Sequence, residues 1–74
     1  MRKSYEWEPR PIADLGDLIG YTILLNCAEG SYQGGLRTIS YDSIIIELDE
    51  GRMLALDRDV LEDEDIQLFT VKRR

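Results

Sequence analysis

The sequence predicts a mainly β protein: a short N-terminal helix followed by a five-stranded, strongly bent antiparallel small barrel. Short apolar runs alternate with turn residues from position 21 onwards, as is typical of short strands. Gly34-Gly35 interrupts the second run, where the pairing is expected to bend or bulge. Ile44-Ile45-Ile46 cannot all face one core, because successive side chains of a strand point to opposite faces. Either a curled sheet or a second copy of the chain therefore covers the other face.

Length and composition favour one soluble globular domain. The chain has 74 residues, of which 43% are hydrophobic and 32% charged. We divide it into an extended arm at residues 1–10 and a single domain at residues 11–74. No apolar run is long enough for a secretory signal or a membrane span. A single cysteine, Cys27, excludes a disulfide within the chain. We expect a cytoplasmic protein with no membrane partner.

The helix is predicted first along the chain. Pro11 suits a helix start, since its missing N–H would be unpaired there. Ile12, Leu15 and Leu18 then recur at helical spacing, and Gly20 ends the helix.

Everything after Gly20 reads as strands and turns. Asp49-Glu50-Gly51 is predicted to be a tight hairpin loop, with glycine where a positive φ is favoured. An acidic connector follows at residues 57–65. The five predicted strands are residues 21–27, 32–41, 43–48, 53–56 and 66–71.

Two of these strands, residues 53–56 and 66–71, are predicted to be edges of the sheet. Both are apolar, and neither carries the lysine or proline that usually protects an exposed edge. We expect edge-to-edge pairing between copies, which closes into a homo-oligomeric ring when the rotation allows. A proline at Leu54 or Leu68 is then expected to disrupt assembly. The predicted interface residues are Met53, Leu54, Leu56, Ile66, Leu68 and Phe69.

Charge is distributed unevenly along the chain. The net charge is −6, but residues 11–71 hold thirteen acids against Arg37, Arg52 and Arg58, a net −10. An acidic body repels a phosphate backbone, whereas basic termini attract one. We favour the interpretation that both regions are solvated surface that serves solubility. The basic residues of the termini are Arg2, Lys3, Arg10, Lys72, Arg73 and Arg74.

The sequence offers few groups for catalysis or metal binding. It has no histidine, and Cys27 in an apolar run is interpreted as a packed small hydrophobe. The acidic run 62–65 lacks the spaced ligands and turn glycine of an EF-hand loop, so we interpret it as a solvated turn. Trp7 is either an anchor on a neighbouring surface or a stacking platform. We expect a protein that is not an enzyme, with no catalytic residue, metal or cofactor.

Several residues stand in a spacing that is typical of one family. The first set is Gly20, Gly30, a glycine at 34 or 35, and Asp42; the second is Gly51-Arg52, Val60-Leu61 and Ile66. With the order of helix and strands, this pattern resembles the Sm/Sm-like (LSm, bacterial host-factor-like) family of small RNA-associated ring proteins, from about Pro11 to Val71.

This resemblance implies an Sm-like, SH3-like barrel that forms a ring of roughly five to seven subunits. It also implies a non-catalytic chaperone or processing accessory that binds RNA or single-stranded nucleic acid. The candidate nucleic-acid contacts are Arg37, Tyr41, Asp42, Ile44 and Arg58.

The chain departs from the family at the base-contacting positions. Ile45 stands where the family has an asparagine that grips a base, and Ile44 where an aromatic residue or methionine often stacks. Leu61 is followed by Glu62-Asp63 in place of Arg-Gly. These differences support the alternative hypothesis, an oligomeric protein-interaction scaffold that has lost nucleic-acid binding, but from the sequence we place nucleic-acid binding first.

Overall fold

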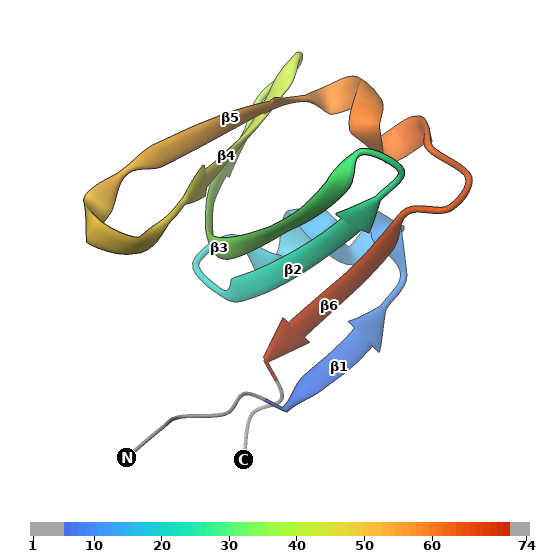
Figure 1. Ribbon diagram of the computed structural model, residues 1–74, viewed down its shortest axis with the longest axis horizontal. Coiled ribbons are helices and arrows are strands. Elements are labelled where there is room, and N and C mark those ends of the chain that lie inside the picture. Colours follow the sequence, from blue (N-terminus) through green and yellow to red (C-terminus); the bar gives the residue numbers. More distant parts are fainter. Residues whose placement is uncertain (1–5, 72–74) are drawn as a thin grey trace.

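The computed structural model describes residues 6–71, which form one antiparallel sheet of six strands with short 3₁₀ helices between them (Figure 1). The strands lie side by side in the order β1-β6-β2-β3-β4-β5. They are β1 (Trp7–Arg10), β2 (Thr22–Cys27), β3 (Gly30–Ile39), β4 (Ser43–Glu47), β5 (Met53–Asp57) and β6 (Gln67–Val71). The 3₁₀ helices are η1 (Ile12–Leu18), η2 (Asp49–Gly51) and η3 (Arg58–Glu62).

A mainly β fold with a short helix ahead of the five predicted strands is confirmed, and β2–β6 occupy those strand positions within a few residues. The count of five strands is wrong, because residues 7–10 add a sixth. Closure into a barrel is not observed: β1 and β5 are the two ends of the sheet, and no ladder joins them.

β1 lies within the segment that we expected to be an extended arm. It pairs antiparallel with β6, with Trp7 opposite Val71 and Pro9 opposite Phe69. β6 therefore has a neighbour on each side, β1 and β2, and is not the free edge that we predicted. An exposed edge strand with the apolar residues of β6 would be prone to pair with another chain, and here the N-terminal segment of the same chain covers it.

The helix η1 begins after Pro11, whose carbonyl accepts a hydrogen bond from the Asp14 N–H at 2.9 Å. Leu15 and Leu18 are buried, and η1 lies against β6. The chain leaves the helix at Gly20, whose φ of 94° suits a residue without Cβ. η1 thus covers part of the sheet's inner face.

β3 turns the corner of the sheet at the predicted glycines. Its first half pairs with β2 and its second half with β4, and Gly35 has a partner in both, Thr22 and Glu47. A Cβ on Gly34 would lie 2.5 Å from the Glu47 carbonyl oxygen and 2.6 Å from Cγ2 of Ile46, so only glycine permits this approach. A register shift between Leu36 and Thr38 adds a bulge close by. Figure 1 shows β3 curving between the β4–β5 hairpin and the β2–β6–β1 part of the sheet.

The isoleucine run divides between the two faces of β4. Ile44 and Ile46 are fully buried, whereas Ile45 between them is half-buried and lies on the outer face. Ile45 stands opposite Ala55 of β5, which is exposed. Curvature of the sheet therefore covers one face of the run, and the outer face is left partly apolar.

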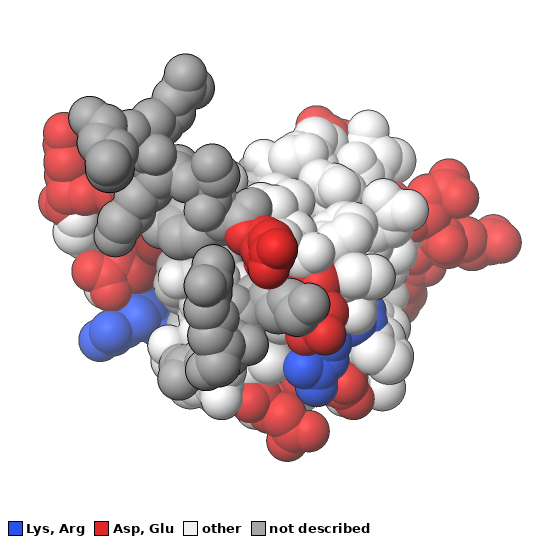
Figure 2. Space-filling model, turned by 90° about the horizontal axis from the view of Figure 1, so that it is seen from below, with Lys and Arg blue, Asp and Glu red and all other residues white. Residues whose placement is uncertain are grey.

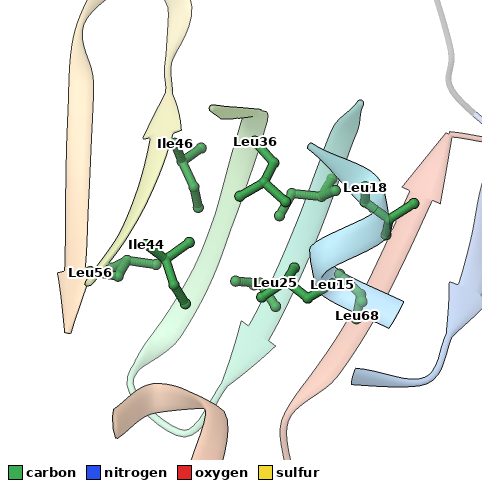
Figure 3. Close-up of a cluster of buried hydrophobic side chains, with 9 residues drawn as sticks. Leu15, Leu18, Leu25, Leu36, Ile44, Ile46, Leu56 and Leu68 are labelled. Atoms are coloured by element: carbon green, nitrogen blue, oxygen red, sulfur yellow. The ribbon is translucent and has the colours of Figure 1, made fainter. Parts of the chain in front are cut away.

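The core joins both halves of the bent sheet to η1. Figure 3 shows Ile44, Ile46, Leu36 and Leu56 from β3, β4 and β5 together with Leu15, Leu18, Leu25 and Leu68 from η1, β2 and β6. Burying each such side chain contributes roughly 1.5–3 kcal/mol.

The buried polar residue among residues 6–71 is Thr70 of β6, whose hydroxyl donates to the Thr22 carbonyl at 3.2 Å. This bond satisfies the hydroxyl inside the core. No helix in this part of the chain is long and apolar enough to cross a membrane.

Candidate functional site

Two surfaces of the β4–β5 region qualify as candidate sites: a hollow around Tyr41 and Arg58, and the free edge of β5. The hollow forms where the β3–β4 loop meets the start of η3. The Arg58 N–H donates to the Asp42 carbonyl at 3.0 Å, and Arg58 Nη1 donates to the Ser40 carbonyl at 2.9 Å. The structure therefore brings together Tyr41, Asp42 and Arg58, three of the five predicted nucleic-acid contacts.

The charge of this hollow is mainly negative. Its lining residues are Tyr41, Asp42, Asp57, Arg58, Asp59, Leu61 and Glu62. Four carboxylates thus surround one guanidinium, and that guanidinium already donates to a backbone carbonyl. Tyr41 is 87% exposed, so its ring is free to contact a ligand. A phosphate backbone that approached this ring would meet a repulsive field.

The other two predicted contacts do not join the hollow. Ile44 is fully buried in the core, so its assignment as a nucleic-acid contact is wrong. Arg37 lies at the bulge of β3 and forms an ion pair with Glu47, with 3.3 Å between Nη1 and Oε1. The family spacing placed Ile44 at a contact position, whereas the alternation of β4 turns it inwards.

Of the predicted basic termini, the structure describes Arg10. Its guanidinium binds the Asp14 carboxylate at 3.0 Å, next to the start of η1. Arg2, Lys3, Lys72, Arg73 and Arg74 lie outside the described residues. Figure 2 shows one face of the molecule, on which red acidic side chains clearly outnumber blue basic ones among the residues that are coloured.

The acidic run 62–65 has a structural use. Asp63 accepts hydrogen bonds from two backbone N–H groups, Asp65 at 2.9 Å and Ala28 at 2.8 Å. The bond from Asp65, and then that from Ala28, lower the pKa of the Asp63 carboxyl below its ordinary value of 3.8. Asp63 thus ties the β2–β3 turn to the segment before β6. Within residues 6–71, no three His, Cys, Asp or Glu side chains gather as metal ligands.

Cys27 lies at the end of β2 and is half-buried. Its thiol donates to the Gly30 carbonyl at 3.4 Å across the β2–β3 turn. This position is at the rim of the molecule, not in the hydrophobic core, and the thiol's observed contact is with the turn.

Hydrogen bonds at both ends of the β4–β5 ladder define which way the backbone of β5 points. At one end the Leu48 N–H donates to the Arg52 carbonyl at 2.7 Å. At the other end the Arg58 N–H donates to the Asp42 carbonyl. Both pairs fit the register of the ladder, and bonded pairs alternate with non-bonded pairs along an antiparallel ladder.

It follows that the backbone groups of Leu54 and Leu56 point towards β4. Those of Met53, Ala55 and Asp57 point away from the sheet, along an edge that no described strand covers. Met53 is 54% exposed and Ala55 is also exposed, so this edge is accessible. We call it the β5 edge.

The predicted interface residues are distributed differently from the expectation. Met53 lies on the β5 edge, whereas Leu54 is half-buried and Leu56 is buried in the core. Ile66 packs against the core, Leu68 is buried, and Phe69 is half-buried between Pro9 and Leu24. A proline at Leu54 or Leu68 would therefore break ladders within the chain, so Ala55 is the position that tests the free edge. Sequence alone did not indicate Ala55, because strand polarity depends on the register of the hairpin.

No family model, curated protein or solved structure matches this chain.

Proposed function

We propose that this chain is a non-catalytic protein-interaction domain that works as an oligomeric scaffold and binds a polypeptide strand at the β5 edge. The observation that carries the proposal is the outward direction of the Met53, Ala55 and Asp57 backbone groups. Three consecutive outward positions can accept a full strand, as in β-strand addition.

The outer face beside this edge adds apolar contact. Met53 and Ala55 are exposed, and Ile45 on the adjacent strand is half-buried. A partner strand that pairs with β5 would bring its own side chains over this strip. Main-chain hydrogen bonds then supply affinity and the strip supplies selectivity.

The alternative is the nucleic-acid-binding role that the Sm-like resemblance implies. The exposed ring of Tyr41 beside Arg58 favours it, because an aromatic platform with a neighbouring cation suits a single-stranded base. The carboxylates of the same hollow oppose it, since they repel phosphates. We therefore place protein binding first.

A fluorescence anisotropy titration with labelled short RNA and DNA oligomers at low salt separates the two functions. The scaffold hypothesis predicts no salt-dependent binding, and the same result for Tyr41→Ala as for the natural chain. Binding that weakens with salt and is lost in Tyr41→Ala would favour the nucleic-acid function instead.

The protein-binding function is tested by substitution on the β5 edge. Ala55→Pro removes an outward N–H, and Ala55→Lys places a charge on the edge; neither touches the bonds to β4. Ala55→Val keeps both the N–H and an apolar side chain and serves as the matched control. Circular dichroism verifies that each variant is folded.

Immobilised chains are then exposed to a nuclease-treated extract. A polypeptide, this chain itself included, is expected to bind the natural protein and Ala55→Val in stoichiometric amounts and to be lost from the other two. Equal capture by all four proteins, or capture that nuclease abolishes, would contradict the proposal.

A further inference from the structure

We propose that the strand that occupies the β5 edge is the β5 edge of a second copy, paired antiparallel about a two-fold axis that passes between the two Ala55 residues. This inference rests on the proposed function and names the partner for the same edge.

Register and strand polarity select this arrangement. An antiparallel pair with two-fold symmetry places residues of the same face opposite each other, because the axis stands perpendicular to the sheet. Centring it on Ala55 sets Ala55 against Ala55 of the other copy and Met53 against Asp57. All three residues have outward backbone groups, so every pair becomes a hydrogen-bonded one. If the two-fold axis were shifted by one residue along β5, one terminal residue of the strand would lie opposite the η2 turn or η3 and could not form a strand pair.

The same register extends the hydrophobic core. Leu54 then stands opposite Leu56 of the other copy in a non-hydrogen-bonded pair, where side chains approach most closely. Leu56 is buried and Leu54 packs against the core from a half-buried position. Two copies thereby join their inner faces into one continuous layer without exposing either core.

Charged residues flank β5 at both ends. Arg52 immediately precedes the strand, whereas Asp57 ends it and Asp59 follows. Among the residues described, Arg52 has no carboxylate within ion-pair distance in its own chain. In this register Arg52 stands opposite Arg58 of the other copy, so the charges do not favour the pairing, which rests on the backbone bonds and the leucine pairs.

The opposite edge of the sheet explains why the partner is another β5 and why the assembly ends at two copies. A head-to-tail ring needs a second free edge, and β1 covers β6. β1 is four residues long and includes Pro9, which has no N–H to donate. Short strands and prolines are the usual protection of an edge against further pairing. A two-fold contact uses one edge from each copy and therefore closes.

Mass measurement tests the number of copies. Light scattering and sedimentation velocity over a dilution series are expected to give the mass of two chains at micromolar concentration. Ala55→Pro and Ala55→Lys are expected to weaken association about tenfold or more, because proline removes an N–H from the central bonded pair and two lysines would place like charges opposite each other. Ala55→Val is expected to remain dimeric. A monomer at every concentration, or a ring of five to seven subunits, would overturn the inference.

Disulfide trapping tests the register, in a Cys27→Ser background. Ala55→Cys places two thiols across the axis at a Cα separation of about 5.5 Å, which a disulfide spans. Met53→Cys is the matched control, since its two copies would lie about four residues apart along the strands. Rapid covalent dimerisation of Ala55→Cys and not of Met53→Cys is expected. Equal rates would exclude the register.

The combined results separate this inference from the function on which it rests. If the chain is monomeric but captures a different polypeptide in a manner that depends on Ala55, strand binding at the β5 edge stands, whereas the oligomeric state and the self-pairing inference fail. If Ala55 variants change neither the mass nor the capture, both fail.

Discussion

The backbone N–H of Ala28 donates to Oδ2 of Asp63 at 2.8 Å, which joins the β2–β3 turn to the segment that leads into β6. The second carboxylate oxygen accepts the N–H of Asp65 at 2.9 Å. One side chain therefore holds together two turns that lie far apart in the sequence.

The first prediction concerns the pH dependence of this tie. Hydrogen bonds from the Asp65 and Ala28 N–H groups lower the pKa of Asp63 in the folded chain, so its contribution to stability is complete above the unfolded pKa, near 4. The contribution is lost as the pH falls through the lower, folded pKa. NMR titration of the Asp63 carboxyl is expected to give a midpoint below 3.8. The amide chemical shifts of Ala28 and Asp65 are expected to change over the same pH range. In Asp63→Asn this change is expected to be absent. A midpoint at or above 3.8 would contradict the bonding.

The second prediction concerns the corner of β3. Gly34→Ala is expected to destabilise the fold by about 1–3 kcal/mol, because the new methyl group overlaps the Glu47 carbonyl and Ile46. Gly35→Ala is the matched control, since a Cβ there meets nothing within 4 Å. Urea unfolding measures both free energies of unfolding. Equal losses for the two variants would show that general strand propensity, and not this close approach, determines the choice of glycine.

The third prediction separates the three isoleucines. Ile46→Ala is expected to cost about 2–5 kcal/mol, since it leaves a cavity in the core. Ile45→Ala, on the half-buried outer face, is expected to cost about 1 kcal/mol in the free energy of unfolding. Thermal and urea unfolding at a concentration where the chain is monomeric measure the difference. The assignment of faces would be wrong if Ile45→Ala proved the more harmful change.

The fourth prediction concerns β1. Deleting residues 1–10 uncovers the outer edge of β6 and removes the ion pair between Arg10 and Asp14. The shortened chain is expected to be less stable and to form larger assemblies, since two free edges permit head-to-tail growth. Sedimentation velocity compares it with the natural chain. An unchanged mass distribution would mean that β1 does not limit assembly.

The sequence contains the local structure of this fold but not its outer pairings. Glycines at 34 and 35 indicated the bend in β3, and the run Ile44-Ile45-Ile46 indicated one inward and one outward face, because both signals depend on near neighbours. β1 was not predicted, since a segment of Trp, Glu, Pro and Arg has no strand-like alternation and its partner, β6, lies at the far end of the chain.

The candidate site was only partly predictable for the same reason. The sequence placed Tyr41, Asp42 and Arg58 near one another, and the three residues do line one hollow. Ile44 was placed with them, but its side chain is buried in the core. The outward N–H of Ala55 depends on which hairpin pairs are hydrogen-bonded, and residue type carries no information about that.

The pairing of β1 with β6 has a consequence for how the chain is made. β2 to β5 each pair with the strand next to them in the sequence, so those hairpins can form as soon as their residues exist. Trp7–Arg10 is synthesised before every other strand, yet its partner ends at Val71. The first of the described strands to leave the ribosome thus cannot pair until the last one has been made, and its pairing closes the longest loop among the described ladders.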